Sequence, residues 1–197
     1  MGLKLKYFNG QTPLNEDEKA GLKIKTISTR QDLDEFEQNN IEKAIAWSLS
    51  RSFTKNNILS LRFILELHKR MFGEVWEWAG NFRKTNKNIG VDKSTISTEL
   101  KKLIDDLNYW VENKTYHPDE IAVRAKYRLV STHLFSNGNG RHSRLYGDLI
   151  ISKIFFKPVF SWGKKVYASG VSRNEYLKAL HAADNGNMES LIKFARL

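Results

Sequence analysis

The sequence predicts an all-α fold, because apolar residues recur at helical spacing through most of the chain after residue 29. Only three prolines occur, and each sits where no helix is expected to be running. With 197 residues, of which 41% are hydrophobic, the chain is long enough for one ordinary domain with a core. We expect residues 1–28 to form a polar N-terminal arm and residues 29–197 to form the domain.

The first two helices are predicted after the arm. Thr29 and Asp32 have the spacing of a loose capping box, which opens the first helix. Its expected apolar face consists of Leu33, Phe36, Ile41, Ala44, Ile45 and Leu49. The expected face of the second helix consists of Leu61, Ile64, Leu65, His68, Met71 and Phe72.

Four more helices are predicted further along the chain. One follows Ser97, and another starts at Pro118, where Asp119 and Glu120 suit the positive end of a helix dipole. The next begins near Gly140, and a capping box at Ser172 opens the last.

One segment, residues 82–96, departs from this periodicity. It is polar, has Gly90 at its centre, and alternates Ile89 and Val91 with polar residues. This pattern predicts a small β-hairpin or an extended flap, with a plain surface loop as the alternative.

Composition excludes some classes of function. The absence of cysteine excludes disulfides, thiolate metal sites and a cysteine nucleophile. No run of about 18 apolar residues is present, so we expect no membrane span and a cytoplasmic protein. The net charge of +10 favours polyanionic partners or simply makes a solvated basic surface. Because the basic residues are scattered along the chain, we do not expect nucleic-acid binding.

The stretch from His133 to Arg144 has the chemistry of a phosphate site. Gly138 and Gly140 let the backbone turn tightly and approach a ligand. The loop runs into a helix N-terminus, where free N–H groups and the helix dipole attract anions. Arg141 and Arg144 lie three residues apart and suit a di- or triphosphate. His133 titrates near neutral pH and could take a proton from a hydroxyl.

The same stretch resembles the signature of the Fic family, His-Pro-Phe-x-Asp/Glu-Gly-Asn-Gly-Arg-x-x-Arg. The matching residues are His133, Phe135, Gly138, Asn139, Gly140, Arg141 and Arg144. The segment from Trp76 to Arg83 also resembles the family, and the likeness extends over about residues 29–195. It is greatest to a bacterial subfamily called mobile mystery protein B. The resemblance implies a bundle of six to eight helices with one β-hairpin flap.

The resemblance also implies an activity and roles for individual residues. Family members mostly transfer AMP from ATP to a hydroxyl of a target protein, with Mg²⁺. By this likeness His133 is the base, Phe135 packs inward, and Arg141 and Arg144 bind the outer phosphates. Nucleotide binding would also involve Asn137, Gly138, Asn139 and Gly140. The flap would pair with the target's extended segment by strand addition, using Thr85, Asn86, Asn88, Ile89 and Gly90.

Two positions depart from the signature. Leu134 replaces proline, which should only loosen the loop. Asn137 replaces the acid that holds the metal. Its amide oxygen can bind Mg²⁺ or Mn²⁺ but brings no charge, so Asn137 is expected to be a weak metal ligand. Three alternatives follow: the metal is held mostly by nucleotide oxygens, another donor or group is used, or the protein is a weak or inactive nucleotide-binding member. In the last case it would act as an interaction or toxin–antitoxin-like component.

Other histidines and glutamates receive structural interpretations. Many Fic proteins carry an inhibitory glutamate in the pattern Ser/Thr-x-x-x-Glu-Gly/Asn, but Glu35 and Glu37 lack the preceding Ser or Thr. We expect them on a solvated face. His142 should be exposed or structural, and His68 and His181 should be packing residues. The sequence leaves a homodimer open, and predicts a target protein with a serine, threonine or tyrosine hydroxyl.

Overall fold

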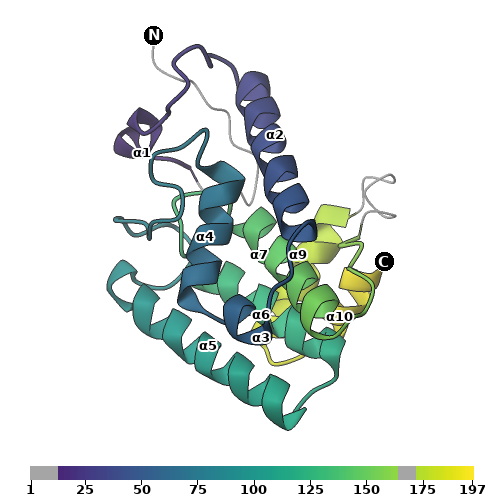
Figure 1. Ribbon diagram of the computed structural model, residues 1–197. Helices are drawn as coiled ribbons and strands as arrows, with labels where there is room; N and C mark the ends of the chain where they lie inside the picture. Colours follow the sequence, from purple (N-terminus) through teal and green to yellow (C-terminus); the bar gives the residue numbers. More distant parts are fainter. Residues whose placement is uncertain (1–12, 164–171) are drawn as a thin grey trace.

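The computed structural model describes residues 13–163 and 172–197, which form helices and no strand (Figure 1). The prediction of an all-α fold is therefore confirmed. Part of the predicted arm, residues 1–12, lies outside the described residues. The helices in chain order are α1 (Glu16–Ala20), α2 (Arg30–Leu49), α3 (Lys55–Ile58), α4 (Leu61–Phe72), the 3₁₀ turn η1 (Lys93–Thr95), α5 (Ile96–Asn113), α6 (Pro118–Thr132), α7 (Asn139–Leu149), the π-helical turn η2 (Ile150–Ile154), α9 (Ser172–Asp184) and α10 (Glu189–Arg196).

Local signals in the sequence set several helix starts. The Thr29 side chain accepts a hydrogen bond from the backbone of Asp32, and the Asp32 carboxylate accepts one from the Thr29 N–H. This reciprocal pair satisfies two N–H groups that have no partner within the helix. Pro118 occupies the first turn of α6, where a missing N–H costs nothing. These predictions of helix starts were correct.

Helix α7 lies at the centre of the bundle and packs against α6 and α4 (Figure 1). Its side chains His142, Tyr146 and Leu149 are buried. Tyr146 donates its hydroxyl hydrogen to the backbone oxygen of Ile58 at 3.0 Å, which ties α7 to the end of α3. The N-terminus of α7, where the motif lies, is therefore held from several sides.

The buried face of α2 is offset from the predicted one. Phe36, Ile45 and Leu49 were expected in the core but are exposed. The residues actually buried are Leu33, Glu37, Asn40, Ile41, Ala44 and Ser48. Glu37 and Asn40 bond to groups across the interface, and an apolar pattern cannot reveal such partners. Ser48 donates its hydroxyl hydrogen to the Ile45 carbonyl of the same helix.

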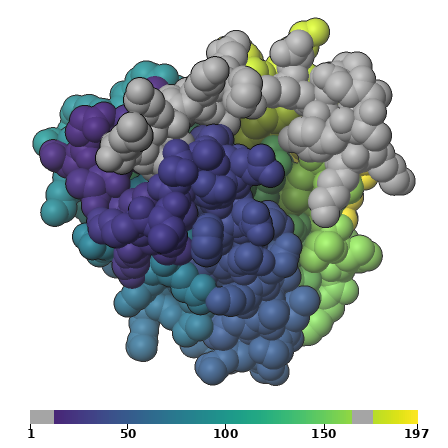
Figure 2. Space-filling view, turned by 90° about the horizontal axis from the view of Figure 1, so that it is seen from above, coloured from purple at the N-terminus to yellow at the C-terminus, as the bar shows by residue number. Residues whose placement is uncertain are grey.

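Residues 13–28 pack onto the domain. Leu14, Leu22 and Ile27 are buried in the core. The backbone of residues 21–23 pairs with that of residues 75–77 through two hydrogen bonds, each 2.9 Å long. Figure 2 shows the described part of the arm in purple beside the blue residues that follow it in the chain. The domain boundary at residue 29 stays a prediction.

Residues 82–92 form an irregular segment of bends without paired strands, and residues 93–96 are helical, so the predicted β-hairpin is wrong. We keep the name flap for this segment. Arg83 explains the difference. Its guanidinium donates to the backbone oxygens of Thr85 and Val91, which lie on opposite arms of the flap. These carbonyls are satisfied by a side chain, so the arms are held together without a ladder of backbone bonds.

His181 was expected to be a packing residue, but 79% of its side chain is exposed, and its Nδ1 lies 3.6 Å from the Asp184 Oδ2.

Over the described ranges, no helix has both the length and the apolar character to cross a bilayer.

Candidate active site

The motif loop joins α6 to α7 through two residues with left-handed backbone conformation. His133 follows the last turn of α6 with φ of 57°, and Gly138 precedes α7 with φ of 77°. A Cβ built on Gly138 would lie 2.5 Å from the ring of Phe72. Both the backbone angle and the space therefore require glycine at position 138.

Asn139 braces the loop internally. Its Oδ1 accepts a hydrogen bond from the N–H of Phe135 at 3.0 Å, and its Nδ2 donates to the Phe135 carbonyl at 2.8 Å. Asn139 is buried. Its side-chain amide is thus used within the loop and fixes the shape of the turn into α7.

His68 of α4 packs against the motif loop and bonds to it. Its ring stacks on Phe135 with centroids 3.6 Å apart, and its Nδ1 accepts from the Gly80 N–H at 3.0 Å. Because Nδ1 accepts, Nε2 carries the proton and donates to the Asn137 carbonyl at 3.1 Å. Burial, together with nearby His142, lowers the pKa of His68 well below its ordinary value. His68 is a packing residue, as predicted, and it also positions the motif.

His142 was expected to be either exposed or structural, and the structure shows a structural role. It is buried, and its Nε2 bonds to the backbone oxygen of Ile64 at 3.0 Å.

The N-terminus of α7 offers an anion site with room in front of it. Among the described residues, no atom beyond the adjoining residues and the backbone of the helix itself lies within 4 Å of a Cβ built on Gly140, so this side of the first turn has space around it. The first N–H groups of a helix lack partners within the helix, and the helix dipole adds positive potential. A phosphate group could therefore approach the backbone at Gly140 directly.

His133 is buried, with 5% of its surface exposed, and neither ring nitrogen has a hydrogen-bond partner among residues 13–163 and 172–197. Burial, followed by the cations Arg83 and Lys87, lowers the pKa of His133 to about 4, and Glu18 acts in the opposite direction. The imidazole is therefore neutral at pH 7 and can accept a proton. An unpartnered neutral imidazole is the group that a general base requires.

The flap packs directly against His133. A Cβ on Gly90, whose φ is 96°, would lie 2.5 Å from the Cβ of His133. Arg83 donates from Nε to the His133 carbonyl at 2.7 Å, and its backbone N–H donates to Leu134. One arginine thus joins the flap to the residue that carries the imidazole.

The predicted flap residues differ in their surroundings. The Asn86 side chain is held within the flap, because Nδ2 donates to Asp92 at 2.6 Å and Oδ1 accepts from the Lys93 N–H at 2.8 Å. The Thr85 hydroxyl accepts from Asn15 of the arm at 3.5 Å. Asn88 and Ile89 are exposed.

Arg141 forms an ion pair with Glu37 of α2. The Arg141 Nη1 lies 2.6 Å from the Glu37 Oε2, and the other carboxylate oxygen accepts from the Trp76 indole at 2.6 Å. Only 3% of the Glu37 side chain is exposed. The expectation of a solvated face is therefore wrong for Glu37, although it is correct for Glu35, which is exposed.

Arg144 lies three residues after Arg141 in α7, with its Cζ 5.1 Å from the centre of the Tyr176 ring. Lys126 of α6 bonds to the Tyr176 hydroxyl and is fully buried. Burial, followed by nearby Arg144, lowers the pKa of Lys126 well below its ordinary value. The structure thus brings a second basic residue close to Arg144.

Asn137 does not make a metal site by itself. Its Oδ1 accepts from the N–H of Gly138 at 2.5 Å. No group of three or more histidine, aspartate or glutamate side chains able to hold a metal exists in the part of the chain that the structure describes. The protein residues here therefore do not fit a resident Mg²⁺ ion, which prefers carboxylates.

The Fic/DOC family model matches residues 58–151, which include the whole motif. The chain contains a Fic/DOC family domain. It is 28% identical over 158 residues to the protein adenylyltransferase Fic of Aedes aegypti, an alignment covering 78% of this chain and 30% of that protein. The chain therefore spans about a third of the length of such relatives.

Solved structures share the Fic fold. Fic-1 of Caenorhabditis elegans superimposes with a TM-score of 0.65 at 25% identity, over 90% of this chain and 50% of that one. BepC of Bartonella tribocorum, solved with bound AMPPNP, gives a TM-score of 0.67 at 19% identity, over 92% and 97% of the two chains. The resemblance to mobile mystery protein B stays a prediction.

Three residues of this Fic/DOC domain were not predicted as part of the site: Glu37, Arg83 and Lys126. A signal existed for Glu37, because it lies four residues from both Leu33 and Ile41 and so shares their face of the helix. Lys126 lies similarly between Ala122 and Leu129 on the apolar face of α6. Arg83 had no such signal, since its backbone partners are set by the tertiary structure.

Proposed function

We propose that this chain is a protein adenylyltransferase that moves AMP from ATP to a hydroxyl side chain of a target protein. The observation that carries the proposal is the arrangement around α7. A neutral, buried and unpartnered imidazole at His133 precedes an open helix N-terminus that bears Arg141 and Arg144. The AMPPNP bound to BepC, which shares this fold, supports a nucleotide as ligand.

The roles follow from this arrangement. His133 would take the proton from a target hydroxyl as its oxygen attacks the α-phosphorus of ATP. The new oxygen–phosphorus bond forms as the bond to the β-phosphate oxygen breaks, and pyrophosphate leaves. The N–H groups at Gly140 and the side chains of Arg141 and Arg144 would stabilise the charge on the phosphates. Phe135, which is fully buried, would hold the loop in this shape.

The proposed reaction needs a divalent metal ion and a target protein. Mg²⁺ or Mn²⁺ would arrive with ATP and be held by phosphate oxygens, because Asn137 supplies no carboxylate. The target would present a serine, threonine or tyrosine hydroxyl. Its chain would run along the flap near Asn88, Ile89 and Gly90. A cytoplasmic location and a homodimer also belong to this proposal.

Incubation of the protein with α-³²P-labelled ATP and a cell lysate tests the proposed function. We expect a labelled target band or labelled enzyme, because only the α-phosphate is transferred. With γ-labelled ATP the same bands should stay unlabelled. Absence of any labelled protein with Mg²⁺ and with Mn²⁺ would contradict the proposal.

The second candidate function is nucleotide binding without transfer, and Asn137 is the observation that favours it. We expect Asn137→Glu to increase labelling at low Mg²⁺, since a carboxylate adds charge to the metal's surroundings. Labelling should be measured over a Mg²⁺ titration for both proteins. Asn113→Glu, which adds the same charge at the exposed end of α5, is the matched control.

The outcome separates the two functions. Labelling by both proteins, with a lower Mg²⁺ requirement in Asn137→Glu, supports transfer by the natural protein. Labelling by Asn137→Glu alone would make the natural protein a nucleotide binder.

A further inference from the structure

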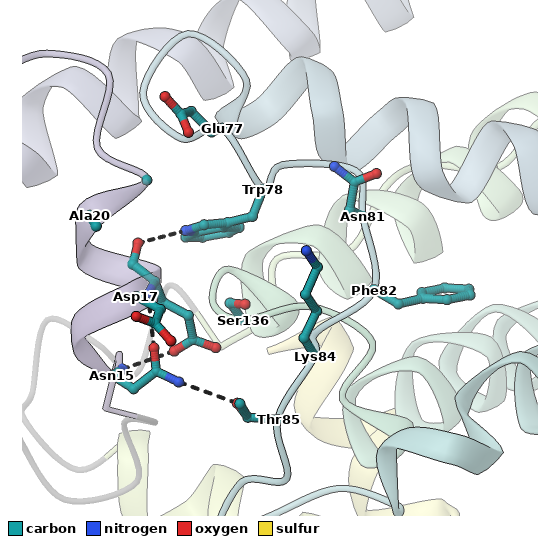
Figure 3. A pocket seen from close by; sticks show the side chains of 12 residues that line it. Asn15, Asp17, Ala20, Glu77, Trp78, Asn81, Phe82, Lys84, Thr85 and Ser136 are labelled. Atoms are coloured by element: carbon teal, nitrogen blue, oxygen red, sulfur yellow. Dashed lines mark hydrogen bonds between the residues drawn. The ribbon is translucent and has the colours of Figure 1, made fainter.

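A pocket of about 650 Å³ lies between α1 and residues 77–85, outside the nucleotide site proposed above (Figure 3). Ser136 of the motif loop and Thr85 of the flap belong to its walls, so the pocket adjoins both parts of the site. Its lining combines carboxylates with aromatic rings: Asp17, Glu18, Glu77, Trp78 and Phe82.

Glu18 has an unsatisfied oxygen in this lining. The residue is 8% exposed, and its Oε2 accepts from Lys87 and from the Asn15 N–H. Its Oε1 is buried and has no hydrogen-bond partner in the described part of the chain. A buried carboxylate oxygen without a donor keeps its negative charge unbalanced, so it adds negative potential behind this wall of the pocket.

Trp78 forms an aromatic wall next to these carboxylates. Its indole N–H donates to the Glu18 carbonyl at 3.0 Å, which fixes the ring against α1. Figure 3 shows the ring and the carboxylates of α1 bordering the same space. An aromatic face beside carboxylates attracts cations.

The charge of the pocket is opposite to that of the chain. The chain carries a net charge of +10, yet three acidic residues line the pocket, and Lys84 is the basic residue among its described lining. Lys87 pairs with Glu18 from outside this lining, which leaves Asp17 and Glu77 as the carboxylates for a ligand. Two of the acidic residues, Asp17 and Glu77, are exposed at the surface and available to a ligand.

We propose that this pocket binds the guanidinium group of an arginine side chain in the target protein, close to the hydroxyl that receives AMP. A guanidinium is planar, can stack on an indole, and has several N–H donors for carboxylates, whereas an ammonium is a compact point charge. The identification of the arginine with a target protein rests on the proposed function. The cation site itself does not.

A titration without nucleotide tests the site. N-acetyl-arginine amide is added to the ¹⁵N-labelled protein, and the indole N–H signal of Trp78, assigned with Trp78→Phe, is followed by NMR. We expect a saturable shift. N-acetyl-citrulline amide, which has nearly the same shape and no charge, should give none. Equal shifts with both compounds, or no saturation with arginine, would overturn the proposal.

Charge variants locate the binding. Asp17→Asn combined with Glu77→Gln should weaken arginine binding by about tenfold, the effect of two partly exposed charges. Glu16→Gln combined with Glu112→Gln removes the same charge from exposed positions outside the lining and should leave binding unchanged. If both pairs of substitutions weakened arginine binding equally, the loss would reflect the net charge of the protein and the proposal would be wrong.

The competing ligand is the base of the nucleotide. If the Trp78 signal shifts with ATP and not with arginine amide, the pocket takes the nucleotide and the proposal is wrong. Arginine binding in a protein that labels no target would overturn the proposed function and leave the cation site standing.

Discussion

Replacement of His133 should lower the rate of protein labelling by about 10²–10⁴-fold, which is the usual loss when a general base is removed. We expect His133→Asn to show this loss with little effect on folding, because asparagine tolerates the left-handed backbone of this position better than alanine. Binding of a non-hydrolysable ATP analogue, measured by calorimetry, should be retained, since the phosphate groups contact α7 in the proposed arrangement.

The pH dependence gives a second measurement of the same role. The pKa of His133 is lowered to about 4, so its neutral, base-competent form persists from neutral pH down to that value. The kcat/KM of labelling should therefore stay level on mild acidification and fall as the pH approaches 4. His181→Ala, at an exposed histidine, is the control and should behave like the natural protein. A labelling rate that His133→Asn leaves intact would remove the base from the mechanism.

Glu37→Gln should strengthen binding of the ATP analogue by about tenfold or more. In the structure the Glu37 carboxylate forms an ion pair with the Arg141 guanidinium, with Oε2 and Nη1 2.6 Å apart. A phosphate must displace it, and a charge-assisted bond of this kind contributes about 1.5–3 kcal/mol. Glutamine keeps an oxygen for the Trp76 indole but removes the charge that repels phosphates. Labelling of the target should rise together with affinity.

The matched control lies two residues earlier on the same helix. Glu35 is exposed, so Glu35→Gln removes an equal charge without touching Arg141 and should leave the affinity unchanged. Thermal unfolding of both variants shows whether the domain remains intact. If Glu37→Gln bound the analogue more weakly than the natural protein, the ion pair would be supporting the site instead of obstructing it.

Local patterns in the sequence were sufficient for much of this fold. The capping pair of Thr29 and Asp32 and the proline at position 118 marked helix starts that the structure contains. The motif was also visible, since its glycines, arginines and histidine lie within one short stretch. Such features depend on neighbours in the chain, and this is why spacing alone could predict them.

Other features could not be predicted because they depend on partners far away in the sequence. The flap lacks a β-hairpin because the Arg83 guanidinium, itself fixed by the His133 carbonyl, satisfies the carbonyls that strands would pair. Helix α2 buries Glu37 because Arg141 and Trp76, more than 30 residues away, supply donors to both of its oxygens.

The sequence by itself therefore determined the helical class, the place of the glycine-rich turn before α7 and the residue types in it. Only the tertiary structure decided that His133 is buried and neutral, that Arg141 is already paired, and that α1 closes an acidic pocket beside the flap. The physical reason is that helix formation follows local spacing, whereas burial and ion pairing depend on which side chains the packed helices bring together.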